Sequence, residues 1–305
     1  MKTLSAFAIV LTLAAAPQAP PPAIVGRWDL TLRSARGDHA GWLEVRHSGI
    51  DTLVGQFVAA GGSARPISRV DFKDGKLRFA IPPQWERADG DVVVAGRLDG
   101  DGLTGTMTVG TAAPVEWTGV RAPALRRSSP PRWGTPIRLL NGRDLAGWHA
   151  IGNSEWQMVG GVLHNRASGG NLVTDRSFDD FKLHAAFRYP KDSNSGIYLR
   201  GRYEVQIIDL DDDPTAVGAL GAIYGFLAPN QAAGRRAGEW QAVDVTLVGR
   251  LVTVVLNGRT IICEAEIPGV TGGALDSHEA EPGPLLLQGD HGPVDFRDLI
   301  VTPGA

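Results

Sequence analysis

The sequence predicts an all-β protein, with a small N-terminal antiparallel barrel or sandwich followed by a larger β-sandwich. Apolar and polar residues alternate with the two-residue period of a half-buried strand, as in Trp28–Leu32. Asp-Gly and Asn-Gly pairs, which favour hairpin turns, recur between such segments. The chain also has 39 Gly and 20 Pro residues, which interrupt helices, and few helix signals.

The N-terminus has the features of a secretory signal peptide, predicted over residues 1–19. Lys2 precedes the apolar run Leu4–Ala16. The run ends in the small residues Ala14–Ala16, which suit signal-peptidase cleavage, and Ala19 offers a second cleavage position. The run is short for a bilayer span, although an N-terminal membrane anchor stays open. Cys263 is the single cysteine, so no disulfide forms within the chain. We therefore expect an exported bacterial protein, periplasmic or extracellular.

Short strands and tight turns divide the rest of the chain into two regions. About seven or eight strand candidates between residues 26 and 121 predict the small barrel or sandwich. Residues 122–136 are rich in Pro, Ser and Arg and form the predicted linker. About eleven strand candidates over residues 137–303 predict a double-sheet sandwich of jelly-roll type.

Composition and missing motifs exclude several function classes. The formal net charge of −3 argues against a nucleic-acid partner, which would favour a basic excess. The sequence has no serine-hydrolase elbow, no zinc-protease helix motif and no phosphate-binding loop. Residues 100–105 match Gly-x-Gly-x-x-Gly, but they lie between two strand candidates and are interpreted as a hairpin turn. A nicotinamide cofactor is therefore not expected.

Several segments of the C-terminal half occur together in an order typical of one family. They are Leu139–Trp148, Trp156, Gly161–Leu163, Asn194–Gly201, Tyr203–Asp209, Gly221–Tyr224, Gly238–Trp240, Leu256–Gly258, Gly283–Gln288, His291 and Phe296–Asp298. With these segments, residues 137–302 resemble the 3-keto-disaccharide hydrolase domain family. The resemblance implies a concanavalin-like β-sandwich and cleavage of glycosides that are already oxidised to a ketone at sugar carbon 3.

The segment Gly196–Gln206, taken as one strand, has a polar face. Successive side chains of a strand alternate between faces, so the even positions fall together. Those positions are Tyr198, Arg200, Arg202, Glu204 and Gln206. Such a face lies either in water or along a binding site, and the family resemblance favours the binding site.

The pattern Glu204-x-Gln206-x-x-Asp209 is similar to the acidic strand of sandwich-fold β-glucanases, Glu-x-Asp-x-x-Glu. Gln206 replaces the middle acid, which disfavours a mechanism that needs two carboxylates about 5 Å apart. Asp209 breaks the alternation, and it joins the polar face only if the strand bulges before it.

A 3-keto sugar permits proton abstraction at carbon 2, because the neighbouring ketone acidifies that hydrogen. Glu204 and His291 are the candidate base and acid, with roles that the sequence leaves interchangeable. Arg200 is the candidate for stabilising the enolate oxygen, and a bound divalent cation is the alternative. The Asp-rich run 209–213 is a candidate site for such a cation or a solvated loop.

Further residues are candidates for binding the substrate. Gln288 follows an apolar strand candidate, and Tyr224 and Trp148 offer flat faces for a sugar ring, although Trp148 equally suits the core. With Tyr198, Gln206 and Asp209 they complete the predicted binding set.

Three functions remain open at the level of sequence. The first is an enzyme that hydrolyses or eliminates 3-keto glycosides, which a separate sugar 3-dehydrogenase would supply. The alternatives are a non-catalytic carbohydrate-binding sandwich and a two-domain structural or scaffolding protein.

Overall fold

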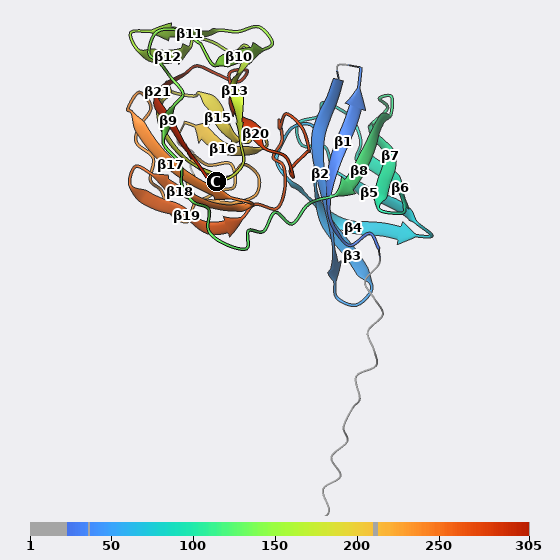
Figure 1. Ribbon diagram of the computed structural model, residues 1–305. Helices are drawn as coiled ribbons and strands as arrows, with labels where there is room; N and C mark the ends of the chain where they lie inside the picture. Colours follow the sequence, from blue (N-terminus) through green and yellow to red (C-terminus); the bar gives the residue numbers. More distant parts are fainter. Residues whose placement is uncertain (1–22, 36, 210–212, 305) are drawn as a thin grey trace, which may run out of the picture.

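The computed structural model describes residues 23–35, 37–209 and 213–304, and within them the protein is built from strands and contains no helix (Figure 1). The predicted all-β fold class is confirmed. Figure 1 shows a barrel, coloured blue to green, beside a two-sheet sandwich, coloured green to red. The predicted signal peptide lies outside the described residues. No helix in the described part of the chain has the length and apolar character needed to cross a membrane.

The N-terminal region is a closed eight-stranded barrel rather than a sandwich. Its strands are β1 (Gly26–Ser34), β2 (Gly37–Ser48), β3 (Thr52–Val58), β4 (Arg65–Lys73), β5 (Lys76–Ile81), β6 (Val92–Asp99), β7 (Gly102–Val109) and β8 (Val115–Arg121). Each strand pairs with the next, and β1 pairs with β8 to close the ring. Alternating residues such as Trp28, Leu30 and Leu32 fill the interior.

Strand β4 was not among the strands expected from sequence. Its burial does not alternate regularly: Arg65, Ile67 and Val70 are buried, and the other residues are not. Its pairing with β3 also shifts register between Leu53 and Gly55. A bulge of this kind removes the two-residue period on which strand prediction depends.

The C-terminal region is a sandwich of two antiparallel sheets. The smaller sheet has the order β10 (Trp148–Ile151), β13 (Asn171–Phe178), β20 (Gly283–Leu287), β15 (Asn194–Leu199) and β16 (Tyr203–Ile208). The larger has the order β11 (Trp156–Val159), β12 (Val162–Asn165), β21 (Val294–Pro303), β14 (Phe181–Arg188), β17 (Gln241–Val248), β18 (Leu251–Leu256) and β19 (Arg259–Glu266), with β9 (Ile137–Arg138) beside β21. One continuous apolar core fills the space between the sheets.

The segment Gly196–Gln206 is a hairpin, and its prediction as one strand is wrong. Strands β15 and β16 pair with Ile197 opposite Val205 and Leu199 opposite Tyr203. The chain reverses at Arg200 and Gly201, whose φ angles are 54° and 68°. The Arg202 N–H donates to the Leu199 carbonyl at 3.0 Å, which closes the turn.

The barrel is packed against the sandwich through an apolar contact. Trp42 of β2 is fully buried, and its ring meets Phe226 of the sandwich edge to face at 5.1 Å. Val58 and Val270 belong to the same cluster. Polar contacts add to it, among them the ion pair of Arg27 with Glu266.

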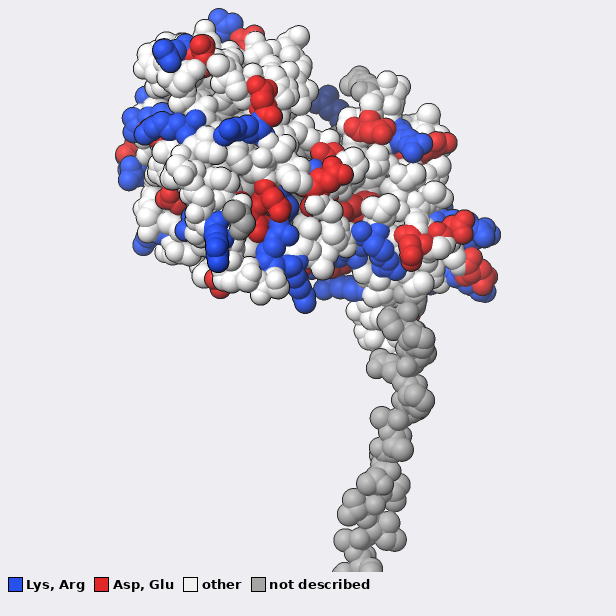
Figure 2. Space-filling model, viewed as in Figure 1, with Lys and Arg blue, Asp and Glu red and all other residues white. Residues whose placement is uncertain are grey.

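Charged side chains of both signs are interspersed over the face of the molecule seen in Figure 2. Lys and Arg gather into no single basic field on that face, in keeping with the net charge of −3. Steering of a strongly charged partner to this face is therefore not expected.

Candidate active site

The hairpin β15–β16 presents polar side chains on the face of the smaller sheet that points away from the apolar core. Tyr198 lies directly opposite Glu204, and Gly196 lies opposite Gln206. Ile197, Val205 and Ile207 point the other way, into the core. A Cβ on Gly196 would lie 2.4 Å from Glu204 Oε1, so glycine leaves the room that the Glu204 side chain occupies.

Glu204 is the central ionisable group of this face and is 4% exposed. Burial raises the pKa of Glu204 to about 8, against the opposing effects of the Tyr198 hydrogen bond and the His291 charge. The Tyr198 hydroxyl lies 2.9 Å both from Glu204 Oε2 and from the Gly272 carbonyl. Burial and then Glu204 raise the pKa of Tyr198 well above its usual value, so this phenol keeps its proton.

His291 follows β20 and stands near Glu204 at a more exposed position. Its Nδ1 donates to Asp290 Oδ1 at 2.6 Å, and half of its side chain is exposed. That hydrogen bond raises the pKa of His291 against the effect of burial, and the charges of Asp290 and Glu204 raise it further. The Glu204 carboxyl group and the His291 imidazole therefore act on each other electrostatically: the charge of each favours the charged form of the other.

Three buried amide oxygens on this face have no hydrogen-bond partner among the described residues. They are Gln206 Oε1, Gln288 Oε1 and Asn194 Oδ1. The Gln288 side chain contacts the Tyr198 hydroxyl through Nε2 at 3.4 Å, and its backbone N–H donates to the Gly196 carbonyl. A buried polar atom without a partner costs free energy, so these oxygens suit the hydroxyl groups of a ligand.

Asn194 was missed in the sequence. It occupies the same alternation as Gly196 and Tyr198, two residues further towards the N-terminus. Extending the even-numbered face to position 194 identifies it.

Tyr224 reaches the same site from a loop. Its backbone N–H donates to the Glu204 carbonyl at 3.0 Å, and a bridge between Val205 and Ile223 holds the loop beside β16. Burial and then the charge of Glu204 raise the pKa of Tyr224. We call Asn194, Tyr198, Glu204, Gln206, Tyr224, Gln288 and His291 the Glu204 cluster.

Arg200 does not belong to the Glu204 cluster. Because it lies in the turn, its side chain leaves the polar face and is fully buried. Its Nη2 donates to the Tyr203 hydroxyl and to the Gly249 carbonyl, each at 3.0 Å, and its Nη1 pairs with Asp179 at 3.2 Å. Among the described residues, no hydrogen bond or ion pair joins Arg200 to Glu204, so this geometry gives no support to the oxyanion role predicted for Arg200.

Arg200 instead joins a second buried group, which we call the Glu279 cluster: Arg200, Arg202, Tyr203, Arg250 and Glu279. Tyr203 donates to Glu279 Oε1 at 2.7 Å, and Arg250 donates to Glu279 Oε2 at 2.5 Å. Arg202 donates to Asp276 and to the Glu281 carbonyl, both at 2.7 Å. These contacts fix the turn end of the hairpin.

Asp209 and Trp148 also lie away from Glu204. The pairing of β15 with β16 runs without a bulge to Ile208, so Asp209 keeps the parity of the core-facing residues. Its carboxylate accepts from the Asp192 N–H at 2.9 Å. Trp148 is 8% exposed and belongs to the sandwich core, with its indole N–H bonded to the Leu139 carbonyl.

A metal site is not found in the part of the chain that the structure describes: no three His, Cys, Asp or Glu side chains there are placed to hold an ion. Residues 210–212 of the Asp-rich run, which the sequence suggested for a cation, lie outside the described residues. The Glu204 cluster itself offers carboxyl, phenol, imidazole and amide groups.

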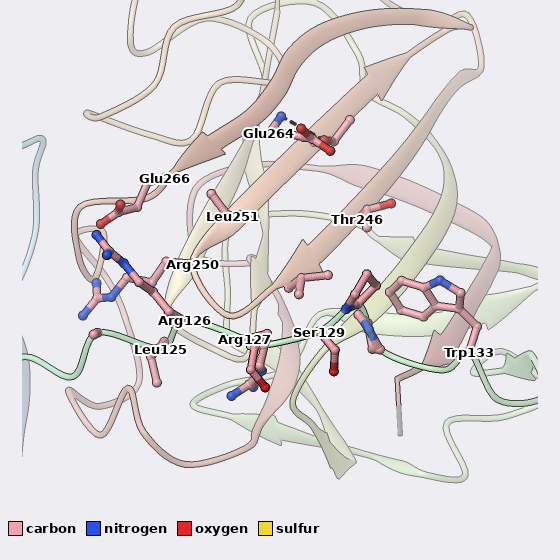
Figure 3. Close-up of a pocket in the computed structure, with 16 residues that line it drawn as sticks. Leu125, Arg126, Arg127, Ser129, Trp133, Thr246, Arg250, Leu251, Glu264 and Glu266 are labelled. Atoms are coloured by element: carbon pink, nitrogen blue, oxygen red, sulfur yellow. Dashed lines mark hydrogen bonds between the residues drawn. The ribbon is translucent and has the colours of Figure 1, made fainter.

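A separate cavity of about 530 Å³ lies between the segment 124–133 and strands β17–β19 (Figure 3). Two of its arginines are engaged, since Arg127 pairs with Asp180 at 2.7 Å and Arg250 pairs with Glu279. No member of the Glu204 cluster lines it. The cavity is thus distinct from the candidate active site.

A family model described as "3-keto-alpha-glucoside-1,2-lyase-like domain" matches residues 135–302, more than half of the chain. The chain belongs to this family. The resemblance expected from sequence is thereby confirmed, and the membership supports an enzyme that acts on glycosides. No curated protein matches the chain.

Solved structures with similar sandwiches include a glycosyl hydrolase candidate from Parabacteroides distasonis. It is 27% identical, with a TM-score of 0.48, over 58% of this chain and 92% of that one. A second structure from the same organism is 20% identical, with a TM-score of 0.47, over 56% of this chain and 94% of that one. The β-glucanase of Bacillus licheniformis is 10% identical, with a TM-score of 0.36, over 59% of this chain and 100% of that one.

Proposed function

We propose that the Glu204 cluster cleaves 3-keto glycosides by removing the proton beside the ketone. The observation that carries this proposal is a buried carboxyl group, with its pKa raised to about 8, among amide oxygens that lack partners. A base with such a pKa is stronger than an ordinary carboxylate and is matched to proton transfer near neutral pH.

The reaction is written as an elimination. The base takes the hydrogen from carbon 2, and the electron pair left behind forms an enolate with the ketone at carbon 3. The enolate then restores the ketone while the bond from carbon 1 to the leaving oxygen breaks, and an acid protonates that oxygen. Addition of water to the resulting double bond, hydroxyl to carbon 1 and proton to carbon 2, completes a net hydrolysis.

We assign the base to Glu204 and the acid to His291. The raised pKa of His291 keeps a proton available for the leaving group, and its greater exposure suits a position at the bond being broken. The candidate donors for the enolate oxygen, in place of Arg200, are the Tyr198 hydroxyl, 2.9 Å from Glu204 Oε2, and the Gln288 amide, 3.4 Å from that hydroxyl.

A glucanase-type mechanism with two carboxylates has little support in this geometry. Asp290 is the second acid whose charge acts on Glu204, but it is hydrogen-bonded to His291. Asp209, the third position of the glucanase pattern, lies on the core-facing parity of the sheet. A single buried carboxyl group is sufficient for elimination but not for a retaining displacement.

The test is turnover of matched native and 3-keto glycosides, with and without chelator. Wild type should cleave the 3-keto compounds alone, and Glu204→Gln should lose at least about a thousandfold in kcat/KM, as for loss of a general base. Glu116→Gln, an exposed barrel position, is the control and should keep full activity.

The pH profile assigns the role of Glu204. With Glu204 as base, kcat/KM for wild type rises with pH through about 8, where the carboxylate forms. A profile that falls through the same pH would make Glu204 the acid. Saturable binding of 3-keto glycosides without any product would instead favour the carbohydrate-binding alternative.

The ketone must come from elsewhere, since the sequence offers no nicotinamide site. We therefore also propose that a separate sugar 3-dehydrogenase supplies the substrate, and that the N-terminal segment directs this protein outside the cytoplasm. Export is tested by locating the mature protein in cell fractions.

A further inference from the structure

The barrel touches the candidate active site through the loop that joins β3 to β4. The Ala60 carbonyl accepts from the Gly273 N–H at 3.0 Å. A Cβ on Gly272 would lie 2.2 Å from the Gly62 carbonyl, and one on Gly225 would lie 2.8 Å from Ser63 Cα. The loop thus lies flush against two segments of the sandwich.

Both of those segments border the Glu204 cluster. The Gly272 carbonyl is 2.9 Å from the Tyr198 hydroxyl, which in turn is 2.9 Å from Glu204. Gly225 directly follows Tyr224. Two chain segments therefore separate the barrel loop from the carboxyl group.

Trp85 is seated on this loop and is exposed. Its indole N–H donates to the Gly61 carbonyl at 3.1 Å, and 54% of its surface is exposed. The preceding Gln84 donates to Ser63 Oγ at 2.6 Å. A large aromatic side chain is thus held in a defined place on the loop that contacts the Gly272 and Gly225 segments, rather than in the barrel core.

The backbone under Trp85 is fixed by a nearly buried ion pair. Glu86 accepts from the Gln84 N–H at 2.8 Å and pairs with Arg65 at 2.9 Å. The Glu86 and Arg65 side chains are only 9% and 7% exposed. A preorganised aromatic ring binds with a small loss of conformational entropy.

We propose that Trp85 of the barrel stacks on the leaving sugar of the substrate and so selects glycosides whose leaving group is a sugar ring. The inference rests on the proposed function, which places the reacting ring at Glu204. Trp85 rests on the loop that contacts the segments bordering that ring, so an exposed indole on the barrel side is available to the neighbouring ring. Indole faces suit the apolar face of a pyranose.

The experiment compares two 3-keto glucosides, one with a methyl leaving group and one with a glucose leaving group. Trp85→Ala should raise KM for the disaccharide about tenfold, equivalent to one aromatic contact, with kcat nearly unchanged. KM for the methyl glycoside should change less than about twofold, and Trp85→Phe should recover most of the loss. Ile50→Ala, which alters an 88% exposed barrel residue outside this loop, is the control.

Calorimetric binding of the same disaccharide to Glu204→Gln, with and without Trp85→Ala, separates the two hypotheses. If Trp85→Ala changes neither Kd in the Glu204→Gln protein nor KM in the otherwise wild-type enzyme, the Trp85 subsite is overturned while the proposed function stands. A wild type that cleaves neither compound overturns the proposed function, and Kd then decides whether Trp85 binds the sugar.

Discussion

Two groups of polar side chains meet at the hairpin β15–β16, and they differ in how completely their buried atoms are paired. In the Glu279 cluster, the carboxylate of Glu279 meets both Tyr203 and Arg250, and Arg250 also donates to the Pro123 and Pro268 carbonyls. In the Glu204 cluster, Glu204, Gln206 and Gln288 are also buried, but three amide oxygens lack a partner among the described residues, against only Arg200 Nε in the Glu279 cluster.

The difference separates stabilising polar groups from groups held ready for a ligand. The Glu279 cluster also binds the two regions of the chain together: burial, followed by a hydrogen bond with Glu279, raises the pKa of Asp29 in β1 to about 9. In the Glu204 cluster, by contrast, the Glu204 carboxyl group is buried and is hydrogen-bonded to the Tyr198 hydroxyl, not to a cation. We therefore expect substitutions in the two clusters to have opposite effects on stability.

The largest effect is expected for Glu279→Ala. Glu279 is fully buried and Arg250 is 2% exposed at the side chain, so the substitution leaves a buried guanidinium without its carboxylate. The free energy of unfolding should fall by about 3–5 kcal/mol. Urea unfolding measures it, and a loss below about 1 kcal/mol would contradict the structural role of the cluster.

Glu204→Gln is expected to stabilise the protein. The carboxyl group titrates near 4.5 when unfolded and about 8 when folded, so wild-type stability falls as pH rises between these values. Gln does not titrate, and its advantage should reach on the order of 3 kcal/mol at pH 7. Unfolding of both proteins from pH 4 to 9 checks this, and parallel stability curves would show that Glu204 is not destabilised by burial.

The smallest difference in stability is expected between substitutions of two buried glutamines, Gln241 and Gln206. Gln241 is buried with both amide atoms bonded, to the Arg235 backbone and Asn257, so Gln241→Leu should cost about 1–3 kcal/mol. Gln206→Leu removes an amide whose oxygen has no partner, and should change stability by less than about 1 kcal/mol. Equal losses in the two variants, measured by thermal unfolding, would remove the distinction between paired and unpaired amides.

Alternation along the hairpin was sufficient to predict that Tyr198, Glu204 and Gln206 share a face. The prediction succeeded although the single strand was wrong, because three residues lie between the paired Leu199 and Tyr203 and the turn preserves even parity. The same turn removed Arg200 from the face. Gly201 was the only sequence signal for this turn. Arg200 gave none, because a residue with a side chain rarely adopts the positive φ angle that Arg200 has here.

Other features depend on contacts between distant segments and have no local signal. The indole N–H of Trp148 is hydrogen-bonded to the Leu139 carbonyl within the core. The register shift between β3 and β4 accompanies a loss of the alternation that would have identified β4 as a strand. The position of Trp85 depends on docking of the barrel through Trp42 and Phe226, residues 184 positions apart in the sequence. Periodicity reports which side chains share a face, but not which loops of another domain reach that face.

The most direct measurement of the central claim is the fate of the hydrogen on carbon 2 during cleavage in deuterium oxide. Nuclear magnetic resonance follows carbon 2 of the released sugar, or its loss of hydrogen in the unsaturated product. We predict that wild type exchanges or removes this hydrogen during turnover, because the Glu204 carboxylate abstracts it, and that Glu204→Gln does neither. Cleavage by wild type with the original hydrogen retained on carbon 2 would contradict proton abstraction beside the ketone.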